Sequence, residues 1–390
     1  MNQIREHAVL KEGFRPFFIL IPAYLILQLF FWSLVWSGVF SFGFSEYPVV
    51  WHIYEMLFGI GSAGVAAFLL TAIPEFIDTA RPVSPKTLLH LVYLWGIGRL
   101  AFWMVDFLGP HLVAITNLPF LIWITLMVAG PIFTDPFKKH RSILYSLLCL
   151  TIIQIIFFLS LTESISLFTP LAILKTAVGF FMILIVVVYR RVATNSINTY
   201  LDRIGSDETF LAKPPRYNLA IFSIFLFTLI ELFQPDNRIL GWIALAAAAA
   251  LLGVLNDFRL EETTILVKPF VLCMGAIPIL MAAGFGLMGM DYLVDAIYGL
   301  NHFRHFLTTG AFGLSFLMVM IIVGYVHTGR PVEINPPVGT AICLMVSAGI
   351  IRGLIPFYPT FTLEAYTVSS LCIGLTFLIY MILFFPYLRR

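Results

Sequence analysis

Twelve runs of predominantly apolar residues, each about 20 residues long, follow one another along this chain. Hydrophobic residues make up 60% of the 390 positions and charged residues only 11%, against roughly 25% in a soluble domain. A water-soluble fold of this size cannot cover that much apolar surface, so a soluble enzyme, a nucleic-acid-binding protein and a disordered chain are excluded. We predict an all-α polytopic integral membrane protein with about twelve transmembrane helices in a lipid bilayer. The predicted spans begin near Pro16, Val50, Lys86, Leu112, Ser142, Leu167, Tyr217, Ile239, Ile265, Arg304, Pro336 and Phe361.

The distribution of Lys and Arg predicts the orientation of these spans. Basic residues concentrate in the two terminal segments and in every second loop, whereas the opposite loops contain only Arg238. Loops rich in Lys and Arg face the cytoplasm in membrane proteins. We therefore expect both termini to be cytoplasmic.

Several residues recur after the same interval along the chain, which indicates an internal repeat. The pairs separated by 253 residues are Arg15 and Lys268, His52 and His305, and Arg99 and Arg352. With a middle unit between these two, the chain would consist of three parallel four-helix units, at residues 1–135, 136–260 and 261–390. The alternative is chance, because basic residues at cytoplasmic helix ends are expected in any case.

Ionisable residues in the predicted spans fall into two layers. An ionised group at the bilayer centre costs roughly 2.5–3.5 kcal/mol on insertion scales, so each needs a partner or a function. The outer, extracytoplasmic layer includes His52, Tyr54, Glu55, Arg99, His305 and Arg352. The inner layer includes Arg15, His327 and Arg330.

The outer layer has the residue types that hold a haem. Neutral imidazole binds haem iron or copper, and arginine pairs with haem propionates. We predict His52 and His305 as iron ligands and Arg99 and Arg352 as propionate partners, with Glu55 orienting a ligand or transferring a proton. Leucine at either arginine is expected to weaken the site without unfolding the protein. The alternative is that these side chains extend to the lipid headgroups. No catalytic residue is predicted.

Six blocks of the sequence carry a family resemblance: Gly13–Phe18, Trp51–Gly59, Gly64–Pro74, Gly98–Ala101, His305–Gly313 and His327–Pro331. They resemble the NnrS family, which comprises polytopic bacterial membrane proteins linked to the nitric-oxide response and described as carrying haem and copper. One departure concerns the second block, where Tyr54 replaces a histidine of the family. If that histidine binds a metal, this chain has lost a ligand or replaced it with phenolate, so copper is left open.

The resemblance implies a haem-binding protein of the bacterial inner membrane that responds to nitric oxide or detoxifies it. It implies a b-type haem, metal binding by His52, His305 and His327, and cofactor contacts from Arg15 and Arg330. The expected partners are nitric oxide or another diatomic ligand and a membrane electron donor. Whether the protein turns over a substrate is left open.

Two other functions also fit the sequence. Twelve spans with internal repeats and buried charges are typical of a secondary transporter with a charged substrate site. A membrane scaffold or signalling subunit would act through the polar cytoplasmic loop at residues 189–216.

Overall fold

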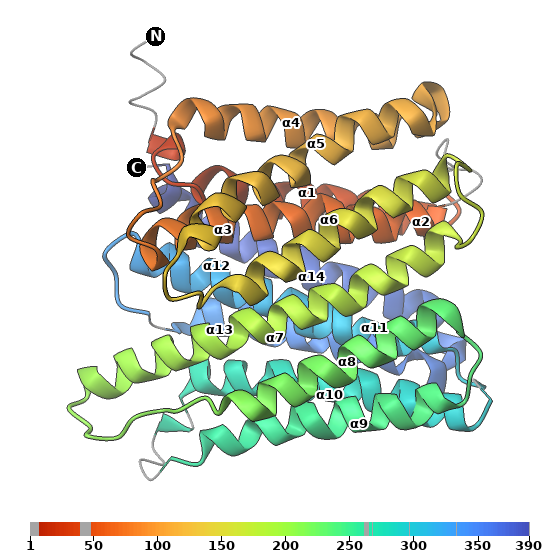
Figure 1. The fold of residues 1–390 in the computed structure, drawn as a ribbon. Helices are drawn as coiled ribbons and strands as arrows, with labels where there is room; N and C mark the ends of the chain where they lie inside the picture. The colour runs from red at the N-terminus through yellow and green to blue at the C-terminus, as the bar shows by residue number, and fades with distance from the viewer. Residues whose placement is uncertain are drawn as a thin grey trace. The chain divides into compact units, whose positions relative to one another are not determined.

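The computed structural model describes residues 8–39, 48–260, 265–266, 268–295, 297–332 and 334–389. Within these residues all regular structure is helical, which confirms the predicted fold class (Figure 1). The α-helices are α1 (Arg15–Trp36), α2 (Pro48–Tyr54), α3 (Ser62–Phe76), α4 (Pro85–Trp103), α5 (Val105–Thr134), α6 (Arg141–Leu161), α7 (Pro170–Arg203), α8 (Pro214–Phe233), α9 (Ile239–Val254), α10 (Pro269–Leu293), α11 (Leu300–His305), α12 (Gly313–Val326), α13 (Pro336–Leu354) and α14 (Thr362–Leu388). Two π-helical segments, η3 (Glu55–Gly61) and η6 (Phe306–Phe312), join α2 to α3 and α11 to α12.

Local sequence explains where several helices begin. Proline stands in the first turn of α1, α4, α8, α10 and α13, where its missing N–H costs no hydrogen bond. The side chains of Ser84 and Asn335 accept hydrogen bonds from backbone N–H groups at the starts of α4 and α13.

Eleven helical segments of the described chain are long and apolar enough to cross a membrane. The apolar run predicted near Lys86 also forms a helix, α4, but it is not among the eleven. Lys86, His90 and Arg99 are spread along this helix and leave it without a stretch as apolar as those of the eleven spans. The chain is therefore a multi-pass membrane protein, and α4 accounts for the difference from the twelve spans expected.

The chain divides into two compact units. Unit 1 comprises residues 1–177, 323–330 and 377–390, and unit 2 comprises residues 178–322 and 331–376. Three of the boundaries fall inside α7, α12 and α14, and the fourth falls between Arg330 and Pro331, in the loop that follows α12. These bounds differ from those of the three predicted repeat units, so the threefold repeat stays a prediction.

In unit 1, α1 runs antiparallel to the continuous segment α2–η3–α3. At one end of this pair, the rings of Trp32 and His52 are stacked with centroids 4.1 Å apart. At the other end, a Cβ atom on Gly13 would lie 2.6 Å from Cβ of Leu70, so glycine allows the two backbones to approach. Helix α4 lies beside α5, and α5 beside α6 (Figure 1).

In unit 2, helices α8, α9 and α10 lie side by side, and η6 packs against α10 and α13. Glycines make the second contact close. A Cβ atom on Gly349 of α13 would lie 2.6 Å from Cα of Gly310, and one on Gly353 would lie 2.3 Å from the Phe306 ring. Both π segments follow a short α-helix that contains one of the predicted iron ligands, His52 or His305. The same succession of a short α-helix and a π-helical segment thus occurs in both of the predicted outer repeat units.

Alanine at Gly349 is expected to destabilise unit 2 by about 1–3 kcal/mol, because its Cβ would meet backbone atoms that cannot rotate away. Alanine at Gly275 of α10, which has open space around it, is the matched control and should be neutral or slightly stabilising. Thermal melting of the two purified variants measures the difference. Equal melting temperatures would show that the α13–η6 contact is not tight.

Candidate functional site

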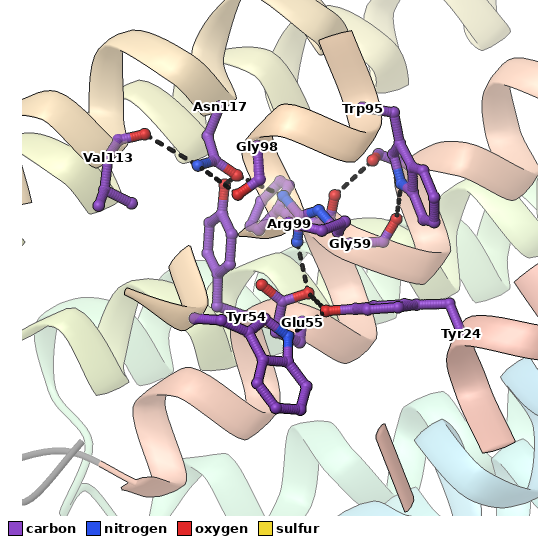
Figure 2. A network of polar contacts seen from close by, with 12 residues as sticks. Tyr24, Tyr54, Glu55, Gly59, Trp95, Gly98, Arg99, Val113 and Asn117 are labelled. Atoms are coloured by element: carbon purple, nitrogen blue, oxygen red, sulfur yellow. Dashed lines mark hydrogen bonds and ion pairs between the residues drawn. The ribbon is translucent and has the colours of Figure 1, made fainter. Parts of the chain in front are cut away.

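A buried network of polar side chains lies in the interior of unit 1 (Figure 2). Its centre is the ion pair between Glu55 of η3 and Arg99 of α4, in which NH1 donates to Oε2 over 2.6 Å. The hydroxyl of Tyr24 on α1 donates to the same carboxylate oxygen over 2.7 Å, and Nε1 of Trp103 donates to that hydroxyl over 2.7 Å. Glu55 is fully buried and Arg99 only 5% exposed, so the two charges compensate each other away from water.

The network continues from Arg99 to α5 and α6. NH2 of Arg99 donates to Oδ1 of Asn117, which also accepts from the hydroxyl of Tyr54 over 3.2 Å. Nε2 of Gln154 donates to the Tyr54 hydroxyl over 2.8 Å. These hydrogen bonds therefore connect η3, α4, α5 and α6 to one another through their side chains.

This geometry bears on two predicted cofactor contacts. The guanidinium of Arg99 is already bonded to Glu55 and Asn117, so a propionate would have to displace one of them. The phenol of Tyr54 is enclosed by the stacked rings of Phe102 and Phe157, and its two hydrogen-bond partners are amides. The roles of Arg99 and Tyr54 in cofactor binding stay predictions, and the observed role of both is in the network.

His52 lies in an aromatic group at the end of unit 1 where α1 ends and α2 begins. Its ring is half-buried and parallel to Trp32, with an interplanar angle of 2°. The rings of Trp51 and Trp103 are 5.1 Å apart, and that of Trp51 lies 6.2 Å from Trp32. An imidazole held on one face by an indole has a fixed orientation.

A second polar cluster lies at the opposite end of the α1 and α2–η3–α3 pair. Nδ1 of His327 is 3.3 Å from Oε1 of Glu12, and its Nε2 is 3.2 Å from Oε1 of Glu75. Nε of Arg15 donates to the other carboxylate oxygen of Glu12 over 2.6 Å. With a carboxylate at each nitrogen, the ring is favoured as imidazolium, which has no lone pair for a metal. Metal binding by His327 stays a prediction and would require one of these contacts to break.

The two polar clusters are separate sites. Glu55 and Glu75 are 20 residues apart on one continuous helical segment, a distance on the order of 30 Å. Arg15 and His327 therefore do not share a cofactor with Glu55 and Arg99. Arg330 is exposed and lies at the same end of unit 1 as His327, with its guanidinium carbon 3.7 Å from the ring centroid of Tyr387.

The charges around His327 determine the protonation of the cluster. The hydrogen bond to Glu12 raises the pKa of His327 against the effect of partial burial, and Glu75 adds to the increase. Partial burial raises the pKa of Glu12, but hydrogen bonds from His327 and Arg15 outweigh it and lower the pKa overall. The charged forms of both groups are thus stabilised in the folded protein.

Glutamine at His327 is expected to lower the melting temperature more at pH 6 than at pH 9. The folded pKa of His327 is raised, so its contribution is complete below the unfolded value of about 6.5 and is lost as pH rises through the folded value. The cluster is partly exposed, so the expected contribution is about 0.5–1 kcal/mol. Glutamine at the exposed His90 is the control. A loss that is the same at both pH values would contradict a charged His327.

In unit 2, two predicted site residues lie on neighbouring helices, His305 at the end of α11 and Arg352 on α13. NH1 of Arg352 is 3.2 Å from Nδ1 of His302, and the guanidinium carbon lies 3.7 Å from the ring centroid of Tyr366. His302 is three residues before His305, whose Nδ1 lies 3.0 Å from the backbone oxygen of Asn301. The predicted ligand His305 and the predicted propionate partner Arg352 thus belong to one end of unit 2, whereas His52 belongs to unit 1.

Unit 2 also contains a buried ion pair that sequence reasoning did not assemble. NH2 of Arg304 donates to Oε1 of Glu231, and the hydroxyl of Tyr292 donates to the same oxygen over 3.0 Å. Arg304 is only 7% exposed. Glu231 and Arg304 are 73 residues apart in the chain, and neither position predicts the other. Among the described residues, no group of three or more His, Cys, Asp or Glu side chains could hold a metal ion.

The profile of the NnrS protein family matches residues 8–390, essentially the whole chain. The chain belongs to the NnrS family. A comparison with curated proteins finds no match. At family level, this membership supports a role in the nitric-oxide response.

Membership in the NnrS family agrees with how the sequence blocks assemble in unit 1. The block at residues 13–18 and the block at residues 327–331 meet where the ring centroids of Phe14 and His327 are 5.1 Å apart. The block at residues 51–59 and the block at residues 98–101 meet in the Glu55–Arg99 ion pair. Tyr24, Asn117 and Gln154 were missed because single polar residues in apolar spans show no motif, and only spatial neighbours reveal their roles.

Proposed function

We propose that this NnrS-family protein binds a b-type haem in the bacterial inner membrane and acts through it in the nitric-oxide response. His305 supplies an imidazole for the iron, and Arg352 supplies a cation for a propionate. The supporting observation is that one end of unit 2 contains both His305, whose Nδ1 lies 3.0 Å from a backbone oxygen, and an arginine that has no carboxylate partner among the described residues.

The protonation state of His305 follows from its neighbours. Nδ1 lies 3.0 Å from the backbone oxygen of Asn301 and 3.2 Å from that of His302. Carbonyl oxygens only accept hydrogen bonds, so Nδ1 must have the proton. In the neutral ring the lone pair is then on Nε2. A metal-binding histidine commonly donates a hydrogen bond from its other nitrogen to a backbone carbonyl, which fixes its tautomer and orientation.

Arg352 is a half-buried cation in an aromatic and imidazole environment. Its neighbours are the ring of Tyr366 and Nδ1 of His302, and within the described residues no carboxylate lies at ion-pair distance. Arg99 and Arg304, by contrast, are each paired with a buried glutamate. A partly buried arginine without an anionic partner favours binding of an anion, and a propionate has that charge.

The donor set in unit 2 fits a haem, which when bound supplies an iron that takes nitric oxide or another diatomic ligand. The chain's own contribution is to bind and orient the group through His305 and Arg352. His52 stays a predicted ligand in unit 1, where Trp32 fixes its ring. Copper is not included in the proposal, because the Tyr54 phenol is occupied by Asn117 and Gln154.

Leucine at Arg352 is expected to weaken haem binding by about tenfold to a hundredfold, since a lost charge-assisted hydrogen bond costs about 1.5–3 kcal/mol. Lysine at Arg352 should retain much of the affinity. Haem titration of purified apoprotein, followed by absorbance, measures the effect, with leucine at the exposed Arg389 as control. Wild-type protein that stays colourless with a full haem supply would contradict the proposal. Substrate uptake by such colourless protein in vesicles would favour the transporter alternative.

A further inference from the structure

The interior of unit 1 contains buried polar atoms without partners. Gln28 of α1 is fully buried, and neither Oε1 nor Nε2 of its amide has a hydrogen-bond partner within the described residues. Glu55 is also fully buried, and only its Oε2 is bonded, to Tyr24 and Arg99. Figure 2 shows both dashed lines reaching one oxygen of this carboxylate, and Oε1 has no partner among the described residues. Unpaired atoms of this kind cost free energy, and buried water commonly satisfies them.

The register of α1 places Gln28 level with the stretch between Glu55 and His52. Tyr24, Gln28 and Trp32 follow at intervals of four residues and therefore share one helix face. One turn before Gln28, Tyr24 bonds to Glu55, and one turn after it, Trp32 stacks on His52. Because α1 and α2–η3 are antiparallel, Gln28 faces the stretch that separates His52 from Glu55.

The backbone near Glu55 also departs from regular helix geometry. The π-helical segment η3 begins at Glu55, and its Gly59 carbonyl accepts a hydrogen bond from Nε1 of Trp95 over 2.8 Å. Single π-helical turns within α-helices occur frequently at functional sites. The carboxylate with the unpaired oxygen thus stands where the helix changes from α to π geometry.

We propose that Gln28 and Glu55 form a buried water-binding site in unit 1, on the His52 side of the Glu55–Arg99 ion pair. A water that donates to Oε1 of Glu55 can accept from Nε2 of Gln28, and a second water can donate to Oε1 of Gln28. This arrangement pairs all three atoms. The site requires a small molecule that both donates and accepts hydrogen bonds, which water does and an apolar diatomic gas does not. Haem is not required for this water-binding site.

Hydroxyl-radical footprinting of the full-length protein in detergent tests the site, because radiolysis of bound water oxidises the side chains beside it. We expect Tyr24 to be labelled in the wild type and this labelling to be lost in Gln28→Leu, which removes both amide groups. Gln28→Asn keeps an amide and should keep part of the labelling. Leu29→Met, a conservative change at the neighbouring buried position, should leave it unchanged.

An experimental structure of the wild type that resolves ordered water is a second, independent test of the water-binding site. It shows whether water is bound there even if Gln28→Leu does not fold. We expect solvent density within hydrogen-bond distance of Oε1 of Glu55 and of the Gln28 amide. The proposal is overturned if the amide bonds directly to Glu55 or another protein group with no density between them. It is also overturned if Tyr24 is labelled equally in the wild type and in Gln28→Leu. Neither result bears on whether the protein binds haem.

Discussion

Leucine at Arg99 is expected to destabilise the protein by about 3–5 kcal/mol, the usual cost of removing one partner of a buried ion pair. The substitution leaves the carboxylate of Glu55 fully buried without a counter-charge, and it removes the donor to Asn117. From sequence alone we expected this change to weaken a cofactor site without unfolding the protein. The pairing with Glu55 changes that expectation, since the ion pair joins η3 to α4. Thermal or denaturant unfolding in detergent measures the loss.

The double variant Arg99→Leu with Glu55→Gln separates charge from packing. With no buried charge left, it should be more stable than Arg99→Leu alone, so the two effects should not add. Leucine at Arg238, whose ion pair with Asp295 is exposed, is the control and should leave the melting temperature nearly unchanged. If Arg99→Leu melts at the wild-type temperature, Glu55 is not a buried carboxylate paired with Arg99.

Alanine at His305 is expected to lower haem affinity by more than about tenfold and to remove the Soret absorption band of the purified protein. The reason is that His305 is the proposed iron ligand, with Nδ1 3.0 Å from a backbone oxygen, and even the outer-shell partners of metal ligands change affinity by about 10–100-fold. The absorption spectrum and the iron content per protein measure the effect.

The control for this variant is alanine at His111, which is exposed at the start of α5 and should leave the spectrum unchanged. Glycine at His305 offers a further check, because added imidazole can enter the vacated position and should restore the band if iron binds there. An unchanged spectrum in His305→Ala would exclude this residue as a ligand. The same measurement on His52→Ala tests the ligand predicted in unit 1.

Much of the architecture could be predicted from the sequence because lipid imposes one strong rule on the backbone. Every span must form its own hydrogen bonds over about 20 apolar residues, so long apolar runs indicate helices directly. The resemblance to the NnrS family rests on short blocks such as residues 327–331, and the family match over residues 8–390 confirms it. The rarity of ionisable residues in spans also identified Glu55 and Arg99 as members of a site.

What the sequence determined by itself is therefore the class of protein, its helices, its family and the ionisable residues that need partners. Only the tertiary structure decided which partners they have. Arg99 bonds to Glu55, 44 residues away, and Arg304 to Glu231, 73 residues away, whereas His327 bonds to Glu12 across 315 residues. Helical periodicity shows which side chains share a face, but it contains no information about the helix opposite. That choice depends on close packing between helices, where glycines such as Gly13 and Gly349 permit contacts that no single segment specifies.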